Sequence, residues 1–306
     1  MKLPARVAIV EVGPRDGLQN IDQFVSTDDK VRLIDAISET GVSGIEATSF
    51  VHPRLVPQMA DAEEVMKRIK RRPGVTYSAL VPNEKGAQRA IDAGVDVVNC
   101  VVSASESHNQ ENVRMSVEDS LAQLTRVAGL AKEAAVPVYA DVSTSFGCPF
   151  EGRVAPERVI AVGRRLRDAG FVRIGLCDTT GMANPLQAAQ LVKRFLEEVP
   201  GIEVGVHFHN TRGAGLANLL AALQSGVDIV AASVGGLGGC PFAPGATGNV
   251  CTEDVVQMLQ EMGIDTRVDL LKAIDAARLA QAILGRELPG QVMKAGRSCD
   301  LHARSR

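Results

Sequence analysis

The sequence predicts an α/β fold, a TIM (β/α)8 barrel with an added C-terminal helical segment. Eight short runs rich in β-forming residues alternate with longer amphipathic stretches, which is the pattern of a parallel barrel. Glycines mark the ends of predicted helices just before the next strand, as at Gly94, Gly170 and Gly226. The 306 residues, 45% of them hydrophobic, suffice for one large core. We therefore expect a barrel catalytic domain over residues 1–265 and a helical extension over 266–306 that packs on it.

The predicted strands recur along the whole barrel segment. They lie at residues 6–12, 44–50, 75–81, 95–103, 136–143, 171–178, 202–209 and 227–234. Between them stand helix signals: a start at Thr27, amphipathic stretches at 61–70, 83–93 and 116–135, and a first-turn proline at Pro156. Asn184 and Pro185 combine an N-cap with a first-turn proline, the stretch 216–224 follows the seventh strand, and Thr252 opens the last barrel helix.

Composition and charge argue against several classes of protein. The net charge is -3 and the one basic cluster, residues 67–72, lies at a predicted helix end, so we expect no nucleic-acid partner. No apolar run approaches the roughly 20 residues that span a bilayer and no signal segment is recognisable, so we expect no membrane partner and a cytoplasmic location. Six cysteines without a C-x-x-C pair favour reduced thiols. A homo-oligomer, taken as a dimer, is the expected assembly.

The unusual polar residues of the chain fall where a TIM barrel carries its chemistry, at the carboxyl ends of the strands. They follow or end strands one, two, six and seven, or lie in the Gly-rich loop after strand eight. They are Glu11, Arg15, Asp16, Gln19, Glu46, Thr48, Ser49, Cys177, Asp178, Thr179, His207, His209, Cys240 and Asn249. Because all eight strand ends meet at one rim, we expect these scattered residues to converge there.

Two histidines separated by one residue indicate a metal site. In an extended strand His207 and His209 point to one face and Phe208 to the other. Together with the Asp16 carboxylate and the Asn249 amide they form a mixed nitrogen and oxygen set, suited to a divalent ion that keeps positions open for substrate. Mg²⁺, Mn²⁺, Co²⁺ and Zn²⁺ are all compatible with this set. For the H-x-H pattern alone, two histidines in a polar layer are an equally good interpretation.

Each candidate residue could also have a purely structural role. Arg15 and Asp16 could form a loop ion pair, and Glu46 could be a buried carboxylate paired to an arginine. Asp178 and Thr179 could form a helix-entry turn, Cys240 could be an inert buried thiol, and Asn249 could be the N-terminal polar residue of the last barrel helix. Any one of these residues could have only a structural role. It is much less expected that all of them do.

Several motifs resemble those of the 3-hydroxy-3-methylglutaryl-CoA (HMG-CoA) lyases, within a larger group of metal-dependent TIM barrels. They are "VEVGPRDGLQN", "GIEATSFV", "VPQM", "GCPFEG", "DTTG", H-x-H and "GGLGGCPFAPGATGN", and the similarity runs over almost the whole chain. The resemblance implies that Asp16, His207, His209 and Asn249 are the metal ligands, Arg15 the cation near the substrate carbonyl, and Cys240 the loop acid. It further implies catalytic roles for Glu46 and Asp178 and substrate-binding roles for Gln19, Ser49 and Thr179, beside Arg15.

The reaction that the resemblance implies is cleavage of HMG-CoA to acetyl-CoA and acetoacetate, in leucine breakdown and ketone-body formation. A divalent metal, Mg²⁺ or Mn²⁺ by preference, would chelate the substrate hydroxyl and terminal carboxylate. Arg15 would neutralise charge on the thioester oxygen. Asp178, His207 or a relay between them would take the hydroxyl proton, and Cys240 would protonate the enolate carbon.

The chain departs from the family pattern at a few positions. Asp22 stands where a basic residue is common, Gly175 where a serine is common and Asn210 where an acidic residue is common, and residues 103–113 differ in character. These departures leave the acyl group open. A lyase for a related 3-hydroxyacyl-CoA, of branched or citramalyl type, is therefore the main rival hypothesis. An acetyl-CoA-dependent Claisen-type synthase and a non-catalytic barrel retained for binding are two further hypotheses.

Overall fold

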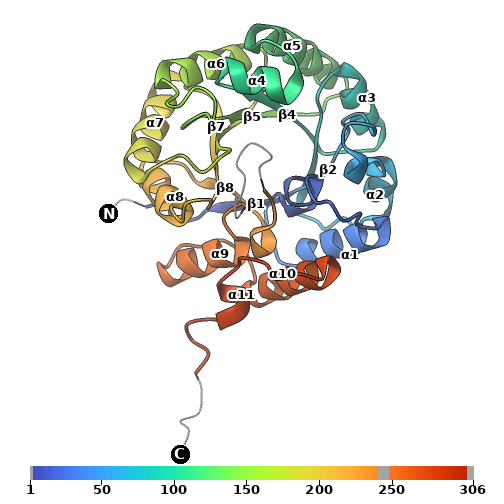
Figure 1. The fold of residues 1–306 in the computed structure, drawn as a ribbon, viewed down its shortest axis with the longest axis vertical. Coiled ribbons are helices and arrows are strands. Elements are labelled where there is room, and N and C mark those ends of the chain that lie inside the picture. The colour runs from blue at the N-terminus through green and yellow to red at the C-terminus, as the bar shows by residue number, and fades with distance from the viewer. Residues whose placement is uncertain (1–2, 240–247, 302–306) are drawn as a thin grey trace, which may run out of the picture.

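The computed structural model describes residues 3–239 and 248–301, and Figure 1 shows the strands at the centre with the helices around them. Within these residues the strands β1 to β8 pair in sequence order, each parallel to the next, and β8 closes the barrel on β1. The predicted TIM barrel is confirmed. Parallel closure brings all the carboxyl ends of the strands to one rim.

The observed elements match the predicted ones closely. The strands are β1 Ala8–Glu11, β2 Gly44–Ser49, β3 Thr76–Leu80, β4 Val97–Ser103, β5 Val138–Ser143, β6 Arg173–Asp178, β7 Glu203–Phe208 and β8 Ile229–Ala232. Each lies inside a predicted strand. The helices are α1 Thr27–Ser38, α2 Ala62–Arg68, α3 Glu84–Asp92, α4 Glu106–Val113, α5 Val117–Glu133, α6 Pro156–Asp168, α7 Pro185–Glu198, α8 Gly215–Gln224, α9 Thr252–Glu261, α10 Leu270–Leu284 and α11 Val292–Ala295.

Side-chain caps explain where several helices begin. The Ser26 side chain accepts a hydrogen bond from the backbone N–H of Asp29 at the start of α1, and Ser116 does the same for α5. At α7 the Asn184 side chain and that of Gln187 satisfy each other's backbone N–H groups, which forms a full capping box ahead of Pro185. The sequence signals at these helix starts are therefore confirmed by the hydrogen bonds.

Three short helical turns complete the described chain. They are η1, a π-turn over Gly13–Gly17, and the 3-10 turns η2 over Pro57–Met59 and η3 over Val234–Gly236. Neither they nor α4 was predicted. The η1 turn follows β1 directly, and the backbone N–H groups of Arg15, Asp16 and Gly17 all donate to the Val12 carbonyl. The turn therefore holds the motif residues tightly against the rim.

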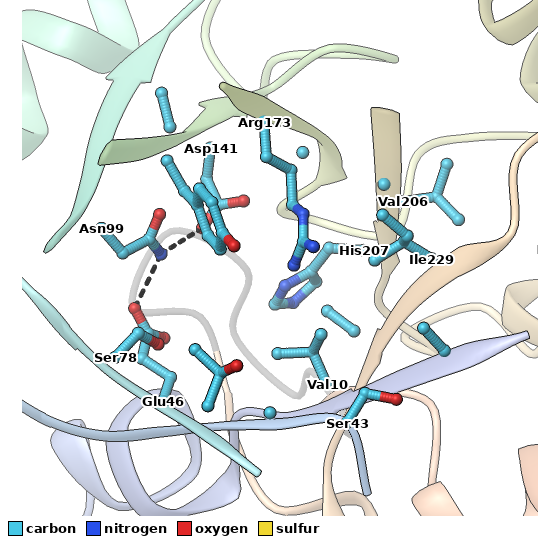
Figure 2. A pocket seen from close by; sticks show the side chains of 18 residues that line it. Val10, Ser43, Glu46, Ser78, Asn99, Asp141, Arg173, Val206, His207 and Ile229 are labelled. Atoms are coloured by element: carbon cyan, nitrogen blue, oxygen red, sulfur yellow. Dashed lines mark hydrogen bonds between the residues drawn. The ribbon is translucent and has the colours of Figure 1, made fainter. Parts of the chain in front are cut away.

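Strand side chains alternate between the helix layer and the barrel interior. Ile45 and Ile174 are fully buried in the hydrophobic core that joins strands to helices. Glu46 and Asn99 face inward instead, and with His207 they line a cavity of about 110 Å³ inside the barrel (Figure 2). The interior beneath the rim is thus polar on several strands.

The segment past residue 266 forms helices that pack on the barrel. Helix α10 contacts α1, α9 and η3, and α11 contacts α9 and α10. Figure 1 shows α9, α10 and α11 together on one side of the ring. Among the described residues we find no helix with the length and hydrophobicity of a membrane span.

Candidate active site

The carboxyl ends of β1 and β7 bring three candidate metal ligands together. Atoms of Asp16, His207 and His209 that can bind a metal lie within 4.8 Å of one another. The two imidazole rings are stacked, with centroids 5.2 Å apart and an interplanar angle of 23°. Nδ1 of His209 is buried and has no hydrogen-bond partner among the described residues. A buried nitrogen without a partner costs free energy unless something binds it, so it points to a ligand.

Asn249 completes this group from the segment before α9. Its Oδ1 lies 2.6 Å from Nε2 of His207, and its Nδ2 donates to Oδ2 of Asp16 at 2.8 Å. The residue that precedes α9 is Cys251, whose side chain makes no capping hydrogen bond, so Asn249 does not serve that helix end. The interpretation of Asn249 as a helix-start residue is wrong. One carboxylate, two imidazoles and an amide oxygen fit a divalent cation by their donor chemistry.

The electrostatics of the cluster keep its donor atoms available. Burial alone would raise the pKa of Asp16, but Arg15, the two histidines and the Asn249 hydrogen bond lower it to about 2. Burial lowers the pKa of His209 to about 4, and His207 adds to that effect. Asp16 is therefore an anion and His209 a neutral imidazole near neutral pH. These are the protonation states that a metal ligand needs.

Arg15 is held between two carboxylates. Its Nε donates to Oε2 of Glu46 at 2.5 Å, and its Nη1 donates to Oδ1 of Asp16 at 2.9 Å. Both of the ion pairs that the sequence allowed for these residues therefore exist. Arg15 and Glu46 are 7% and 1% exposed, so neither charge is solvated by bulk water and each depends on the other. Burial, with a contribution from Asp141, raises the pKa of Glu46, while Arg15 opposes that shift.

Asp178 ends β6 with its side chain buried. Its Oδ1 accepts hydrogen bonds from the backbone N–H groups of Met182 and Ala183, so it holds the turn toward α7. The helix-entry role is thus real. Burial raises the pKa of Asp178 to about 6, although these hydrogen bonds and the nearby His207 lower it in part. A carboxylate with this pKa is mostly ionised at neutral pH and more basic than an ordinary aspartate.

Gln19, Ser49 and Thr179 make no hydrogen bond to this group among the described residues. Oγ1 of Thr179 accepts from the backbone N–H of Thr144, and Oγ of Ser49 accepts from that of Val51. Oε1 of Gln19 is buried without a hydrogen-bond partner among the described residues. Cys240 lies outside the described residues. Hydrogen bonds and the metal-ligand geometry therefore join Arg15, Asp16, Glu46, His207, His209 and Asn249 directly.

Two residues of the site were not among the predicted ones. Nδ2 of Asn99 on β4 donates both to Oε1 of Glu46 and to Oδ2 of Asp141 on β5, each at 2.8 Å. Figure 2 shows both hydrogen bonds, and His207 lines the same cavity. The sequence did contain a signal, because an Asn and an Asp interrupt strands that are otherwise apolar.

Glu11, the first polar residue of the rim, serves the scaffold. Its carboxylate accepts from the backbone N–H groups of Gly13 and Val234 and from Oγ1 of Thr252. Burial raises its pKa to about 7. These contacts tie the end of β1 to η3 and to the start of α9. Glu11 thereby fixes the segment from which the Gly-rich loop departs.

Comparisons with known proteins identify the family. A profile described as HMGL-like matches residues 6–280. The chain is 44% identical to the hydroxymethylglutaryl-CoA lyase of Bacillus subtilis over 298 residues, which covers 97% of this chain and 100% of that one. It is 47% identical to the mitochondrial hydroxymethylglutaryl-CoA lyase of Gallus gallus over 292 residues, with 95% and 98% covered.

Solved structures agree with the sequence comparison. The HMG-CoA lyase of Acinetobacter baumannii in complex with coenzyme A and 3-methylmalate superposes with a TM-score of 0.94 at 44% identity, covering 98% of each chain. The resemblance inferred from the motifs is confirmed. This chain therefore belongs to the HMGL-like family.

Proposed function

We propose that this protein is a carbon–carbon lyase that cleaves HMG-CoA to acetyl-CoA and acetoacetate with the help of a divalent metal ion. The observation that carries the proposal is the cluster of Asp16, His207 and His209 directly beside Arg15, in a chain 44% identical to a hydroxymethylglutaryl-CoA lyase over 97% of its length. A metal-ligand set next to a buried cation suits a substrate that has a hydroxyl group and a thioester carbonyl.

Asp16, His207, His209 and Asn249 would hold the metal ion. Their donor set and the unpartnered Nδ1 of His209 support this assignment. A bound divalent ion would act as a Lewis acid on the substrate oxygens and make the hydroxyl proton more acidic. We propose Mg²⁺ or Mn²⁺, with Co²⁺ and Zn²⁺ compatible with the same ligands.

Arg15 would bind the thioester oxygen. Two of its nitrogens donate to Glu46 and Asp16, and Nη2 donates no hydrogen bond among the described residues, which leaves that end of the guanidinium for substrate. Charge develops on the thioester oxygen as the bond between the second and third substrate carbons breaks. A fixed guanidinium stabilises that charge without having to reorient.

Two residues would move the protons. Asp178, or His207 coupled to it, takes the proton of the C3 hydroxyl; the O–H electrons form the ketone, the C2–C3 bond breaks, and its electrons form the enolate of acetyl-CoA. The pKa of about 6 at Asp178 supports its role as the base. Cys240 then donates a proton to C2, which gives acetyl-CoA. The proton added to C2 balances the one that the base took from the hydroxyl group.

Other features of the protein follow from the same assignment. Gln19, Ser49 and Thr179 would bind the acyl-CoA substrate around Arg15. A relative from Acinetobacter baumannii was solved in complex with coenzyme A and 3-methylmalate, which supports an acyl-CoA ligand here. We propose a homodimer in the cytoplasm, with residues 266–306 as an extension of the catalytic barrel.

The test is a substrate panel with product identification. Purified protein with Mg²⁺ is incubated with HMG-CoA, with branched 3-hydroxyacyl-CoA analogues and with citramalyl-CoA. A separate arm offers acetyl-CoA with 2-oxo acids and follows free thiol. We expect the largest kcat/KM for HMG-CoA. A larger kcat/KM for another thioester would show that HMG-CoA is not the preferred substrate. Release of free thiol from acetyl-CoA with a 2-oxo acid would show that the protein is a synthase rather than a lyase.

A further inference from the structure

Asp141 and Asn99 form a polar link inside the barrel, below the proposed site. They come from neighbouring strands, β5 and β4, and both point into the interior cavity. Figure 2 shows Asn99 between Asp141 and Glu46, with a hydrogen bond to each. The proposed reaction uses neither residue directly. Their contacts nevertheless lead to Arg15.

The amide of Asn99 has its orientation fixed by two carboxylates. Its Nδ2 donates to Oε1 of Glu46 and to Oδ2 of Asp141, each at 2.8 Å. An amide nitrogen carries two hydrogens, so both are used here. Carboxylates accept hydrogen bonds, so the nitrogen rather than the oxygen of Asn99 faces them. Without Asp141 the amide would lose one of the two contacts that hold it.

Glu46 passes this constraint to Arg15. Oε1 of Glu46 accepts from Asn99, while Oε2 accepts from Nε of Arg15 at 2.5 Å. Both carboxylate oxygens are therefore engaged, and the carboxylate plane is set from two sides. Three consecutive hydrogen bonds thus connect Asp141 to the guanidinium, and chains of buried hydrogen bonds reinforce one another.

Gly175 provides the space that Asp141 needs. The two residues are paired on β5 and β6, and a Cβ atom at position 175 would lie 2.1 Å from Oδ1 of Asp141. No real Cβ contact is that short, so any side chain at 175 would displace the carboxylate.

We propose that Asp141 is a positioning residue for the lyase reaction: through Asn99 and Glu46 it fixes the orientation of Arg15, and Gly175 is required to accommodate it. The inference rests on the proposed function, because it assigns the catalytic contact to Arg15. It adds residues to the site that neither the motifs nor the ligand set contain.

Truncation of Asp141 should leave the fold intact. The side chain lines a cavity of about 110 Å³, large enough for several water molecules, and it is only partly buried. Water can replace the lost carboxylate in such a place, so the barrel keeps its packing. Asp141→Ala is therefore a usable variant, and Asp141→Ser, which is too short to reach Asn99, replaces it if the alanine variant is unstable.

The first measurement separates turnover from binding. With HMG-CoA as substrate, Asp141→Ala should lower kcat by roughly 10- to 100-fold, the usual cost of removing a supporting hydrogen-bond partner, and leave KM within about threefold. Asp141→Asn keeps the size and one acceptor oxygen, so it should recover most of kcat. Ser78→Ala is the matched control, because Ser78 lines the same cavity and, among the described residues, its hydroxyl hydrogen-bonds only to the backbone carbonyl of Ile45.

The second measurement is a double-mutant cycle. Gly175→Ala alone should lower kcat about as much as Asp141→Ala, because the added methyl group displaces the carboxylate. In the double variant the methyl group has room, so kcat should equal that of Asp141→Ala alone rather than fall further. Multiplicative losses in the double variant would overturn the role of Gly175.

The outcomes distinguish this inference from the proposed function. Wild-type protein with no lyase activity would contradict the proposed function. Active wild-type protein with Asp141→Ala within twofold in kcat would overturn only the positioning role. A crystal structure of Asp141→Ala gives a readout independent of activity: we expect a displaced Asn99 amide and a changed contact between Glu46 and Arg15, and an unchanged Arg15 position overturns the inference.

Discussion

Arg15 donates from Nε to Oε2 of Glu46 at 2.5 Å inside the barrel, and both side chains are almost completely buried. Loss of Arg15 would leave the buried Glu46 carboxylate without its counter-ion, and loss of Glu46 would leave Arg15 with Asp16 alone. The pair lies next to Asp16, which belongs to the proposed metal-ligand set. The ion pair thus connects the cation expected to bind substrate with the group expected to bind metal.

Arg15→Met should retain the bound metal but lose about a thousandfold in kcat, the scale of removing a preorganised group that stabilises developing charge. The methionine side chain has a similar length and cannot hydrogen-bond the thioester oxygen. Elemental analysis measures whether the metal is retained, and single-turnover kinetics measure the loss of the chemical step. Turnover within tenfold of the wild type would show that another group stabilises the enolate.

Asp16→Ala and His209→Ala should weaken metal binding by at least about tenfold, because each removes one ligand from the cluster. Titration of chelator-treated protein with Mn²⁺, followed by calorimetry, measures the affinity directly. His52→Ala is the control, since the ring of that exposed histidine hydrogen-bonds, within the described part of the chain, only to the backbone N–H of Arg54. Wild-type affinity in both ligand variants would exclude this cluster as the metal site.

Glu253 gives a stability prediction that depends on pH. Burial raises its pKa in the folded protein from 4.5 to about 8, and its Oε1 has no hydrogen-bond partner among the described residues. The folded state therefore holds this proton more tightly than the unfolded state, so the stabilisation is complete below pH 4.5 and is lost as pH rises toward 8.

Glu253→Gln should flatten this dependence, because an amide does not titrate. Thermal unfolding between pH 5 and 9 should show a steeper decline for the wild type than for the variant. Glu261→Gln, an exposed position on the same helix α9, should keep the wild-type slope. Parallel curves for the wild type and Glu253→Gln would mean that Glu253 is ionised in the folded protein.

Cys240→Ser should fold and bind metal normally but turn over about 10²-fold more slowly, the scale of a lost general acid. Thiol alkylation should inactivate the wild type and spare the residual activity of this variant. Cys299→Ser is the matched control, because Cys299 is an exposed free thiol. If Cys240→Ser keeps turnover within a few-fold, another group supplies the proton to the enolate carbon.

The barrel could be predicted from sequence because its signals are local. Short apolar runs, glycines after helices and caps such as Asn184 act within a few residues of one another, and the structure bears them out. Helix α4 was missed because this kind of signal is absent there. Residues 106–113 are almost all polar, so no apolar face indicates the helix that Ser105 caps.

The meeting of Asp16, His207 and His209 was predictable because an extended chain at the end of β7 places the two histidines on one face, and the motif after β1 supplies Asp16. The link from Asp141 to Glu46 was not. It depends on which strands are neighbours in the closed barrel and on the space above Gly175, and neither can be read from spacing along the chain. Gly175 was visible in the sequence, but the space that it leaves for Asp141 lies across the sheet.

The most direct test of the proposed function is a product assay on purified wild-type protein with HMG-CoA, with Mg²⁺ present and after treatment with chelator. We predict equimolar acetyl-CoA and acetoacetate with Mg²⁺, no products after chelation, and recovery when Mg²⁺ or Mn²⁺ is restored. The metal content of the chelator-treated protein is first verified to lie below the enzyme concentration. Unchanged cleavage by that protein would contradict the proposed function, and so would a failure to cleave HMG-CoA with metal present.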